Sequence, residues 1–182
     1  MERLGRATIA IYNSYDPRVF REAHRRILAR AGPLALAYDL NLATFGFPFP
    51  EGLDQPVELA DWVASTTSIG EDGSYLKELA AKGRFQSFPC PSRGIPPQLG
   101  VAVLTTCDPD PRKRMELEQL VGMLRLGHSA CLIFGAGPKG VPRQVREMSK
   151  YHLDITFDGR SLETCTALGA VAGALAHLLR RP

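Results

Sequence analysis

Two loops carry the residue types best suited to binding a ligand. Residues 135–140 (GAGPKG) follow an apolar run at 129–134 and precede a predicted helix. Residues 158–160 (DGR) follow the apolar run 151–157 and open a long helix that begins SLETCTALG. Glycine lets the backbone approach a ligand closely, and ligands of α/β proteins bind outside the carboxyl ends of parallel strands. The two loops are therefore predicted to line one pocket.

The glycine spacing of the first loop also fits other interpretations. It matches GxGxxG between a strand and a helix, the local context of a dinucleotide-binding fingerprint. Few elements follow it in the chain, however, and Pro138 has no backbone N–H to offer a phosphate. A P-loop is excluded, because Lys139 precedes Gly140 instead of following it. A plain tight turn stays open as the alternative without a ligand.

Three arginines near the N-terminus could bind phosphate. Arg18, Arg21 and Arg25 are spaced three and four apart, so on a helix that starts at Pro17 they share one face. Such a row is typical of contacts to a nucleic-acid backbone. An ordinary solvated charged face is the alternative, and the net charge of +3 permits a nucleic-acid partner without requiring one.

Glu163 falls in the first turn of the terminal helix, where the helix dipole favours a carboxylate. It is either a helix cap or a pocket acid that acts as general base. The four histidines lack metal-ligand spacing and the four cysteines form no CxxC pair. We therefore predict no metal site and a reducing, cytoplasmic location. No signal peptide is recognised after Met1, and the apolar run 167–176 is too short to span a bilayer.

The elements that must position these groups alternate along the chain. About six strands and intervening helices are predicted, which indicates an α/β fold with a mostly parallel sheet, helices on both faces and one domain over residues 1–182. Residues 40–55 and 89–98 are interpreted as loops. The strands are expected at 7–12, 33–39, 84–88, 101–105, 129–134 and 151–157, and the helices at 17–32, 56–67, 74–82, 111–127, 141–150 and 161–179.

Two stretches near the end of the chain resemble motifs of the SPOUT superfamily of trefoil-knot RNA methyltransferases. Residues 135–142 (GAGPKGVP) are similar to its second motif, and residues 155–167 (ITFDGRSLETCTA) are similar to its third. The two stand in the family's order. Residues 11–32 resemble the first motif more weakly, with Arg25 at the position of the family's arginine, or Arg26 if the gap falls one residue later.

The resemblance implies a knot over about residues 101–179 and S-adenosylmethionine as cofactor, bound largely by backbone groups of three loops. It implies transfer of a methyl group to a ribose hydroxyl or base atom of tRNA or rRNA, with Arg25 as a catalytic candidate. Glu163, from its place in the first turn of the terminal helix, is the second catalytic candidate, and Arg18 and Arg21, from their spacing, are the RNA-binding candidates. It also implies a homodimer through the first and terminal helices. The implied cofactor-binding residues are Leu104, Thr105, Gly135, Gly137, Gly140, Ile155 and Leu162.

The sequence departs from the family pattern at three positions that serve chemistry or RNA positioning. Gly137 replaces a glutamate of the second motif, Glu163 an asparagine of the third, and Val19 an asparagine of the first. Two other functions therefore stay open: a non-catalytic knot-fold protein that binds RNA or a nucleotide, and a nicotinamide-binding oxidoreductase.

Overall fold

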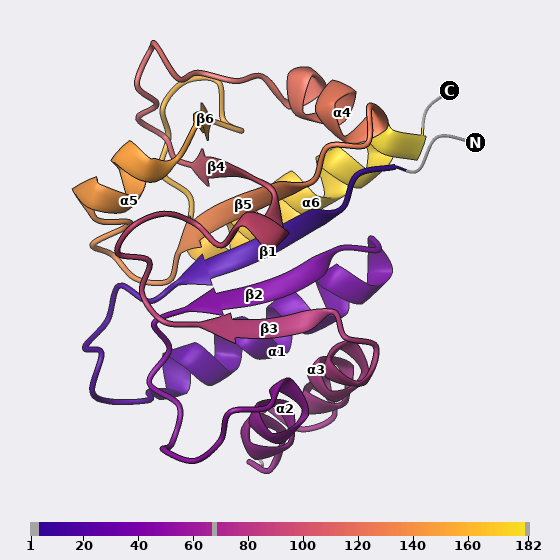
Figure 1. Cartoon of the computed structure of the whole chain (residues 1–182), viewed down its shortest axis with the longest axis vertical. Coiled ribbons are helices and arrows are strands. Elements are labelled where there is room, and N and C mark those ends of the chain that lie inside the picture. Colours follow the sequence, from indigo (N-terminus) through magenta and orange to yellow (C-terminus); the bar gives the residue numbers. More distant parts are fainter. Residues whose placement is uncertain (1–3, 67–68, 181–182) are drawn as a thin grey trace.

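The computed structural model describes residues 4–66 and 69–180, and its centre is a six-stranded sheet (Figure 1). All strand pairs are parallel, in the order β3-β2-β1-β5-β4-β6. The predicted α/β class with a parallel sheet is confirmed. The strands are β1 (Ala7–Tyr12), β2 (Asn41–Phe45), β3 (Phe85–Phe88), β4 (Val101–Thr105), β5 (Ala130–Gly135) and β6 (Tyr151–Leu153).

Helices connect the strands. They are α1 (Glu22–Ala37), α2 (Pro56–Ala64), α3 (Asp72–Ala81), α4 (Leu117–Arg125), α5 (Arg143–Met148) and α6 (Thr164–Arg180), with a short 3-10 turn at Pro97–Leu99. None of the helices in the described ranges combines the length and apolarity needed to cross a bilayer. The predicted domain begins at Met1 and the second predicted helix ends at Thr67, and both of these residues lie outside the described ranges.

The sheet is buried on both faces. Ile9 and Ile11 of β1 point into the larger core, which contains the apolar residues of α1 and α6, and these two helices lie behind the sheet in Figure 1. Ala10 of β1 points to the opposite face, where Leu99 and Val145 of α5 pack. The unbroken apolar run of β1 is explained by this double burial, because no position of a central parallel strand faces water.

The first helix is longer than predicted, and the strand predicted at 33–39 is wrong. Residues up to 37 are helical with Pro33 inside the helix, and the second strand is Asn41–Phe45, within a stretch predicted to be a loop. Leu28, Ala31 and Ala35 are all fully buried at a spacing of three and four. This helical burial pattern outweighs the hydrogen bond that Pro33 removes.

The start of the first helix is also corrected. Asp16 does not cap it. The Asp16 carboxylate accepts the backbone N–H of Arg18 at 3.0 Å in a tight turn. The helix begins at Glu22 with Arg21 as its N-cap residue, and the Arg21 N–H donates to Nδ1 of His24 at 2.9 Å. Arg18 and Arg21 therefore precede the helix and do not share a helical face with Arg25.

The helix predicted from residue 111 begins later, at Leu117. The segment before it runs along β6, where Met115 N–H donates to the His152 carbonyl and His152 N–H donates to the Lys113 carbonyl. These bonds occupy the open edge of β6, which would otherwise present unpaired backbone groups. Residues 106–108 lead from β4 into this segment, and the Thr106 N–H donates to the Leu153 carbonyl at 2.9 Å.

Candidate ligand-binding site

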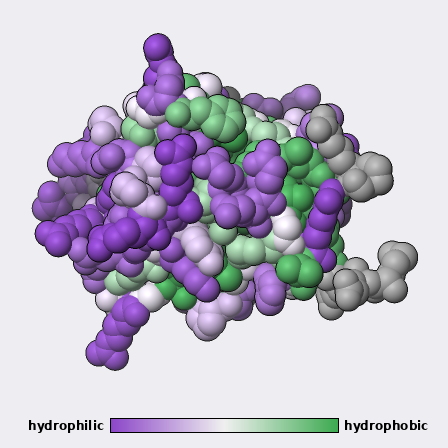
Figure 2. Space-filling view, turned by 90° about the horizontal axis from the view of Figure 1, so that it is seen from above, coloured by the Kyte–Doolittle hydropathy of each residue, from purple (hydrophilic) through white to green (hydrophobic). Residues whose placement is uncertain are grey.

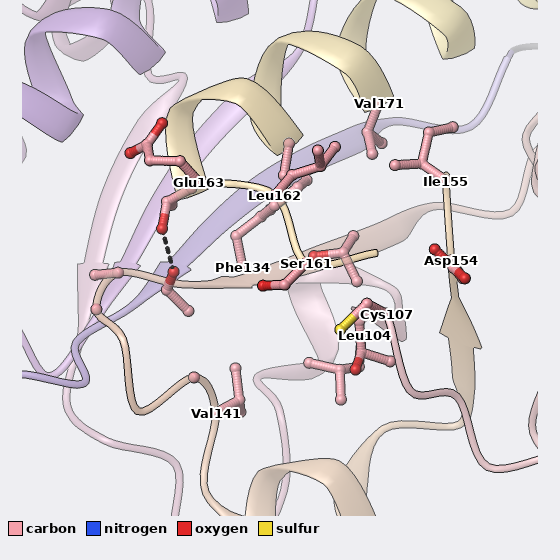
Figure 3. Close-up of a pocket in the computed structure, with 18 of the residues that line it drawn as sticks. Leu104, Cys107, Phe134, Val141, Asp154, Ile155, Ser161, Leu162, Glu163 and Val171 are labelled. Atoms are coloured by element: carbon pink, nitrogen blue, oxygen red, sulfur yellow. Dashed lines mark hydrogen bonds between the residues drawn. The ribbon is translucent and has the colours of Figure 1, made fainter. Parts of the chain in front are cut away.

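A cavity of about 560 Å³ lies at the carboxyl ends of β4, β5 and β6 (Figure 3). It is lined by residues 104–107, by the glycine loop after β5, and by the loop between β6 and α6. The structure thus brings the two predicted loops together at one site. The volume falls in the range of small-molecule pockets.

Each of the seven residues predicted to bind the cofactor lines this cavity. The set comprises Leu104, Thr105, Gly135, Gly137, Gly140, Ile155 and Leu162. The placement fits the prediction, and their binding role stays a prediction. Leu104, Phe134 and Val171 supply apolar surface to the cavity (Figure 3).

Glycine is required in the first loop for two physical reasons. Gly140 has a φ of +63°, a left-handed conformation that costs other residues energy. A Cβ at Gly135 would lie 3.0 Å from the backbone of Gly140, and one at Gly137 would lie 3.2 Å from the ring of Tyr15. The loop therefore folds back tightly on itself, and its own backbone forms part of the cavity wall.

The other loop is held by the buried side chain of Asp154. Its carboxylate accepts hydrogen bonds from the backbone N–H and hydroxyl of Thr156, at 2.9 and 2.6 Å, and from Gly159 N–H at 3.1 Å. Burial alone would raise the pKa of Asp154, but these hydrogen bonds outweigh it and hold the pKa below its usual value. Asp154 is thus an ionised anchor for the loop.

A hydrogen bond joins the two loops. The Thr164 hydroxyl, at the start of α6, donates to the Gly135 carbonyl at 2.8 Å (dashed in Figure 3). Within the ranges that the structure describes, the backbone N–H groups of Ile155 and Leu162 have no intramolecular partner. The two loops are therefore held together at the cavity, and the residues that carry these two N–H groups line it.

Glu163 caps α6. Its carboxylate accepts the backbone N–H groups of Cys165 and Thr166 at 2.9 and 3.1 Å, and it points away from the cavity in Figure 3. Burial would raise the pKa of Glu163, but the backbone hydrogen bonds outweigh it and keep the pKa below its usual value. Of the two predicted roles, the structure shows the cap, and no contact in it supports a general base.

Arg25 does not line the cavity of its own chain. Its guanidinium carbon lies 4.3 Å from the centroid of the Trp62 ring, and Nη1 donates to the Val63 carbonyl at 3.3 Å. Arg18 is exposed and pairs with Asp16 at 3.0 Å. The loop that carries Arg18 also carries Tyr15, which does line the cavity. Arg18 is therefore close in sequence to a residue that lines the cavity, whereas the side chain of Arg25 packs α1 against α2.

Sequence reasoning missed several polar residues of the site. Tyr15 lies in the loop after β1, and its place at a strand end was the available signal. Arg146 of α5 donates to the Thr106 hydroxyl at 3.3 Å and to the Asp108 carbonyl at 2.7 Å, and no spacing in the sequence marks it. In the described part of the chain, no three His, Cys, Asp or Glu side chains are grouped so that they could hold a metal ion.

The fold and the place of the cavity define a class: this is the fold of SpoU-type methyltransferases. A probable methylase family protein from Haemophilus influenzae matches with a TM-score of 0.58 at 13% identity, over 95% of this chain and 65% of that one. AviRb from Streptomyces viridochromogenes, a SpoU methyltransferase solved with AdoMet, matches with 0.54 at 12%, over 97% and 58%. A protein solved to explain 2-OH methylation of C/U34 on tRNA matches with 0.55 at 16%, over 96% of both chains. The predicted SPOUT resemblance is confirmed for the fold.

The sequence itself belongs to a narrower family. Residues 7–176 match the family described as "Protein of unknown function (DUF531)", and the chain is a member of it. It is 35% identical over 175 residues to the uncharacterized protein MJ0224 of Methanocaldococcus jannaschii, covering 96% of each chain.

Proposed function

We propose that this protein is an S-adenosylmethionine-dependent methyltransferase that acts on RNA, at a ribose hydroxyl or a base atom of tRNA or rRNA. The observation that carries the proposal is the cavity at the carboxyl ends of β4, β5 and β6, walled by backbone of three loops. It occurs in a fold shared with a methyltransferase solved with AdoMet and with a protein of tRNA 2-OH methylation.

The residues of the cavity fit this cofactor. S-adenosylmethionine would supply the activated methyl group, and the apolar side chains Leu104 and Val171 offer a surface for its uncharged parts. The unpaired N–H groups of Ile155 and Leu162 offer hydrogen bonds to its polar edges. Gly135 and Gly140 keep the opposite wall free of side chains, so that the backbone can approach.

The rim of the cavity is suited to a phosphate-bearing substrate. Lys139, Arg146 and Arg160 line it, whereas the two lining carboxylates, Asp154 and Glu163, are turned to backbone N–H groups. Figure 2 shows hydrophilic side chains gathered on the left of the view, the side on which α5 lies in Figure 1. These cations would attract an RNA backbone and position it over the cavity.

A second candidate, a knot-fold protein that binds RNA or a nucleotide without catalysis, is favoured by a specific observation. Arg25 packs on Trp62 outside the cavity, and the carboxylate of Glu163, which lines the cavity, is engaged in capping α6. We propose that a homodimer through α1 and α6 completes the site.

The knot and the cytoplasmic location stay predictions.

Calorimetric titration with S-adenosylmethionine and S-adenosylhomocysteine tests the proposal. We expect binding by the wild type and none of comparable strength for NAD. Incubation with bulk tRNA and rRNA, followed by mass spectrometry of the nucleosides, then separates the two candidates. Cofactor binding without any methylated nucleoside would favour the non-catalytic protein, and tight NAD binding would favour an oxidoreductase.

A further inference from the structure

Phe157 combines two features that the fold does not explain. It is 76% exposed, and its backbone has a φ of +65°. Among the non-glycine residues in the described ranges, only Asp39 shares a positive φ, and aspartate tolerates this conformation whereas a bulky aromatic residue rarely adopts it. A residue that packs nowhere and strains its backbone contributes nothing evident to stability, so an outlier of this kind points to function.

The loop around Phe157 is built to hold this conformation. Asp154 binds Thr156 and Gly159 on either side of Phe157, and the Thr156 hydroxyl in turn accepts the N–H of Arg160 at 3.0 Å. A Cβ at Gly159 would lie 3.1 Å from the Cys107 carbonyl, so the loop also rests on the segment after β4. The aromatic ring is thus presented to solvent by a fixed support.

The position of the ring decides what it can meet. Thr156 and Arg160 line the cavity, but Phe157 between them does not. The ring therefore stands outside the space available to a cofactor, one residue from its edge. Arg160 beside it has an 81% exposed side chain that pairs with Asp158 at 2.8 Å on the surface. Lys139 of the glycine loop lines the cavity and forms no ion pair within the described residues.

We propose that Phe157 is a stacking platform for a nucleobase of the RNA substrate, which it holds at the rim of the cavity while Lys139 and Arg160 contact phosphates. The inference rests on the proposed function and adds the residue that positions the base. Planar aromatic faces stack on every base, and RNA-binding proteins use them together with cations that follow the backbone. Because hydrogen bonds already fix the loop that carries the ring, binding a base costs little conformational entropy of the loop, which favours such a role.

The test uses two single-stranded RNAs of equal length and charge, oligoadenylate and an abasic oligomer, whose binding is measured by fluorescence anisotropy. The wild type should prefer oligoadenylate by about 10-fold, the equivalent of one base–aromatic stacking contact. Phe157→Ala should remove this preference, and Phe157→Trp should keep it. Leu126→Ala is the matched control, because Leu126 is 73% exposed at the end of α4.

Two further measurements separate this inference from its alternatives. S-adenosylmethionine affinity should be equal in the wild type and Phe157→Ala, and Phe157→Gly should unfold at a higher temperature than the wild type, because glycine removes the strain. An unchanged base preference in Phe157→Ala, or no preference in the wild type, would overturn the proposal. So would a loss of cofactor affinity or a lower unfolding temperature for Phe157→Gly. If the wild type binds no S-adenosylmethionine, the proposed function fails, while the base preference still reports on Phe157 separately.

Discussion

His24 is expected to make the stability of this protein depend on pH. It is fully buried, and both ring nitrogens are engaged. Nδ1 accepts the Arg21 N–H at 2.9 Å, which leaves Nε2 to donate to Asn13 Oδ1 at 2.9 Å. The ring also lies against Phe47, at a centroid distance of 4.8 Å. Burial, and secondly the charge of Arg21, lower the pKa of His24 to about 4.

The sign and size of the effect follow from this pKa. An unfolded histidine has a pKa of about 6.5, so between about pH 6.5 and 4 the unfolded chain binds a proton that the folded chain does not. The part of the stability that depends on His24 is therefore intact above about pH 6.5, falls as the pH is lowered, and levels off below about 4. A difference of about 2.5 between the pKa values, at about 1.4 kcal/mol for each pKa unit, gives a loss of about 3 to 4 kcal/mol.

Urea unfolding at several pH values between about 7 and 4 measures this loss. His24→Gln can keep both hydrogen bonds and has no proton to gain. Over this pH range, the unfolding free energy of His24→Gln should therefore change by about 3 kcal/mol less than that of the wild type. His152 is the matched control, because burial lowers its pKa as well. His152→Gln should reduce the loss of unfolding free energy at low pH by a different amount than His24→Gln does. An equal pH dependence in wild type and His24→Gln would refute the reasoning.

Three other predictions concern ligands and assembly. Gly140→Val should abolish S-adenosylmethionine binding in calorimetry and stay folded by circular dichroism. Gly83→Val is the control and should still bind the cofactor. Both glycines have a positive φ and open space at Cβ, but only Gly140 lines the cavity. Arg18→Ala and Arg21→Ala should weaken tRNA binding and each flatten its salt dependence, and a slope equal to that of the wild type would place the RNA elsewhere. Gly169→Arg should convert a dimer into monomers in light scattering, since a Cβ at Gly169 would meet no atom within 4 Å outside its own stretch of helix. A wild-type monomer at micromolar concentration would exclude the dimer.

The site was predictable where its signals are local. The glycine loop, the polar turn before α6 and the strands in front of them follow from composition and order along the chain, and the fold brings the ends of parallel strands to one edge. The cavity formed by these loops confirms that part. The knot resemblance pointed to the same residues, because backbone-lined sites tolerate changes of side chain.

The arginine row was wrong because it depended on where one helix begins. Spacing alone allows a helix from Pro17, but the Asp16 turn and the His24 contact to Arg21 start it at Glu22. His24 meets Asn13, which is eleven positions away in the sequence and on another element. Such a contact is decided by tertiary packing, which periodicity does not report.

The terminal helix shows the same limit. Its many small residues allow a neighbouring element to pack closely, but their spacing does not say which residue faces which side. Ala172 is 1% exposed, so an arginine there would disrupt the core and not an interface. Gly169 instead points to open space. The exposed side of α6, next to α1, is therefore where a second chain would pack.

Whether this protein is an enzyme or a binding protein depends on whether a second chain packs against the exposed side of α6. Within one chain, Asp154 is saturated by loop hydrogen bonds, Glu163 caps α6 and Arg146 holds residues 106–108. These groups shape the cavity, but none is free to take a proton from a methyl acceptor. In the proposed methyltransferase, a second copy or the RNA would then supply a catalytic group. A monomer that binds the cofactor would thus favour the non-catalytic function, and a dimer whose arginine variants lose turnover while they keep cofactor affinity would favour the methyltransferase.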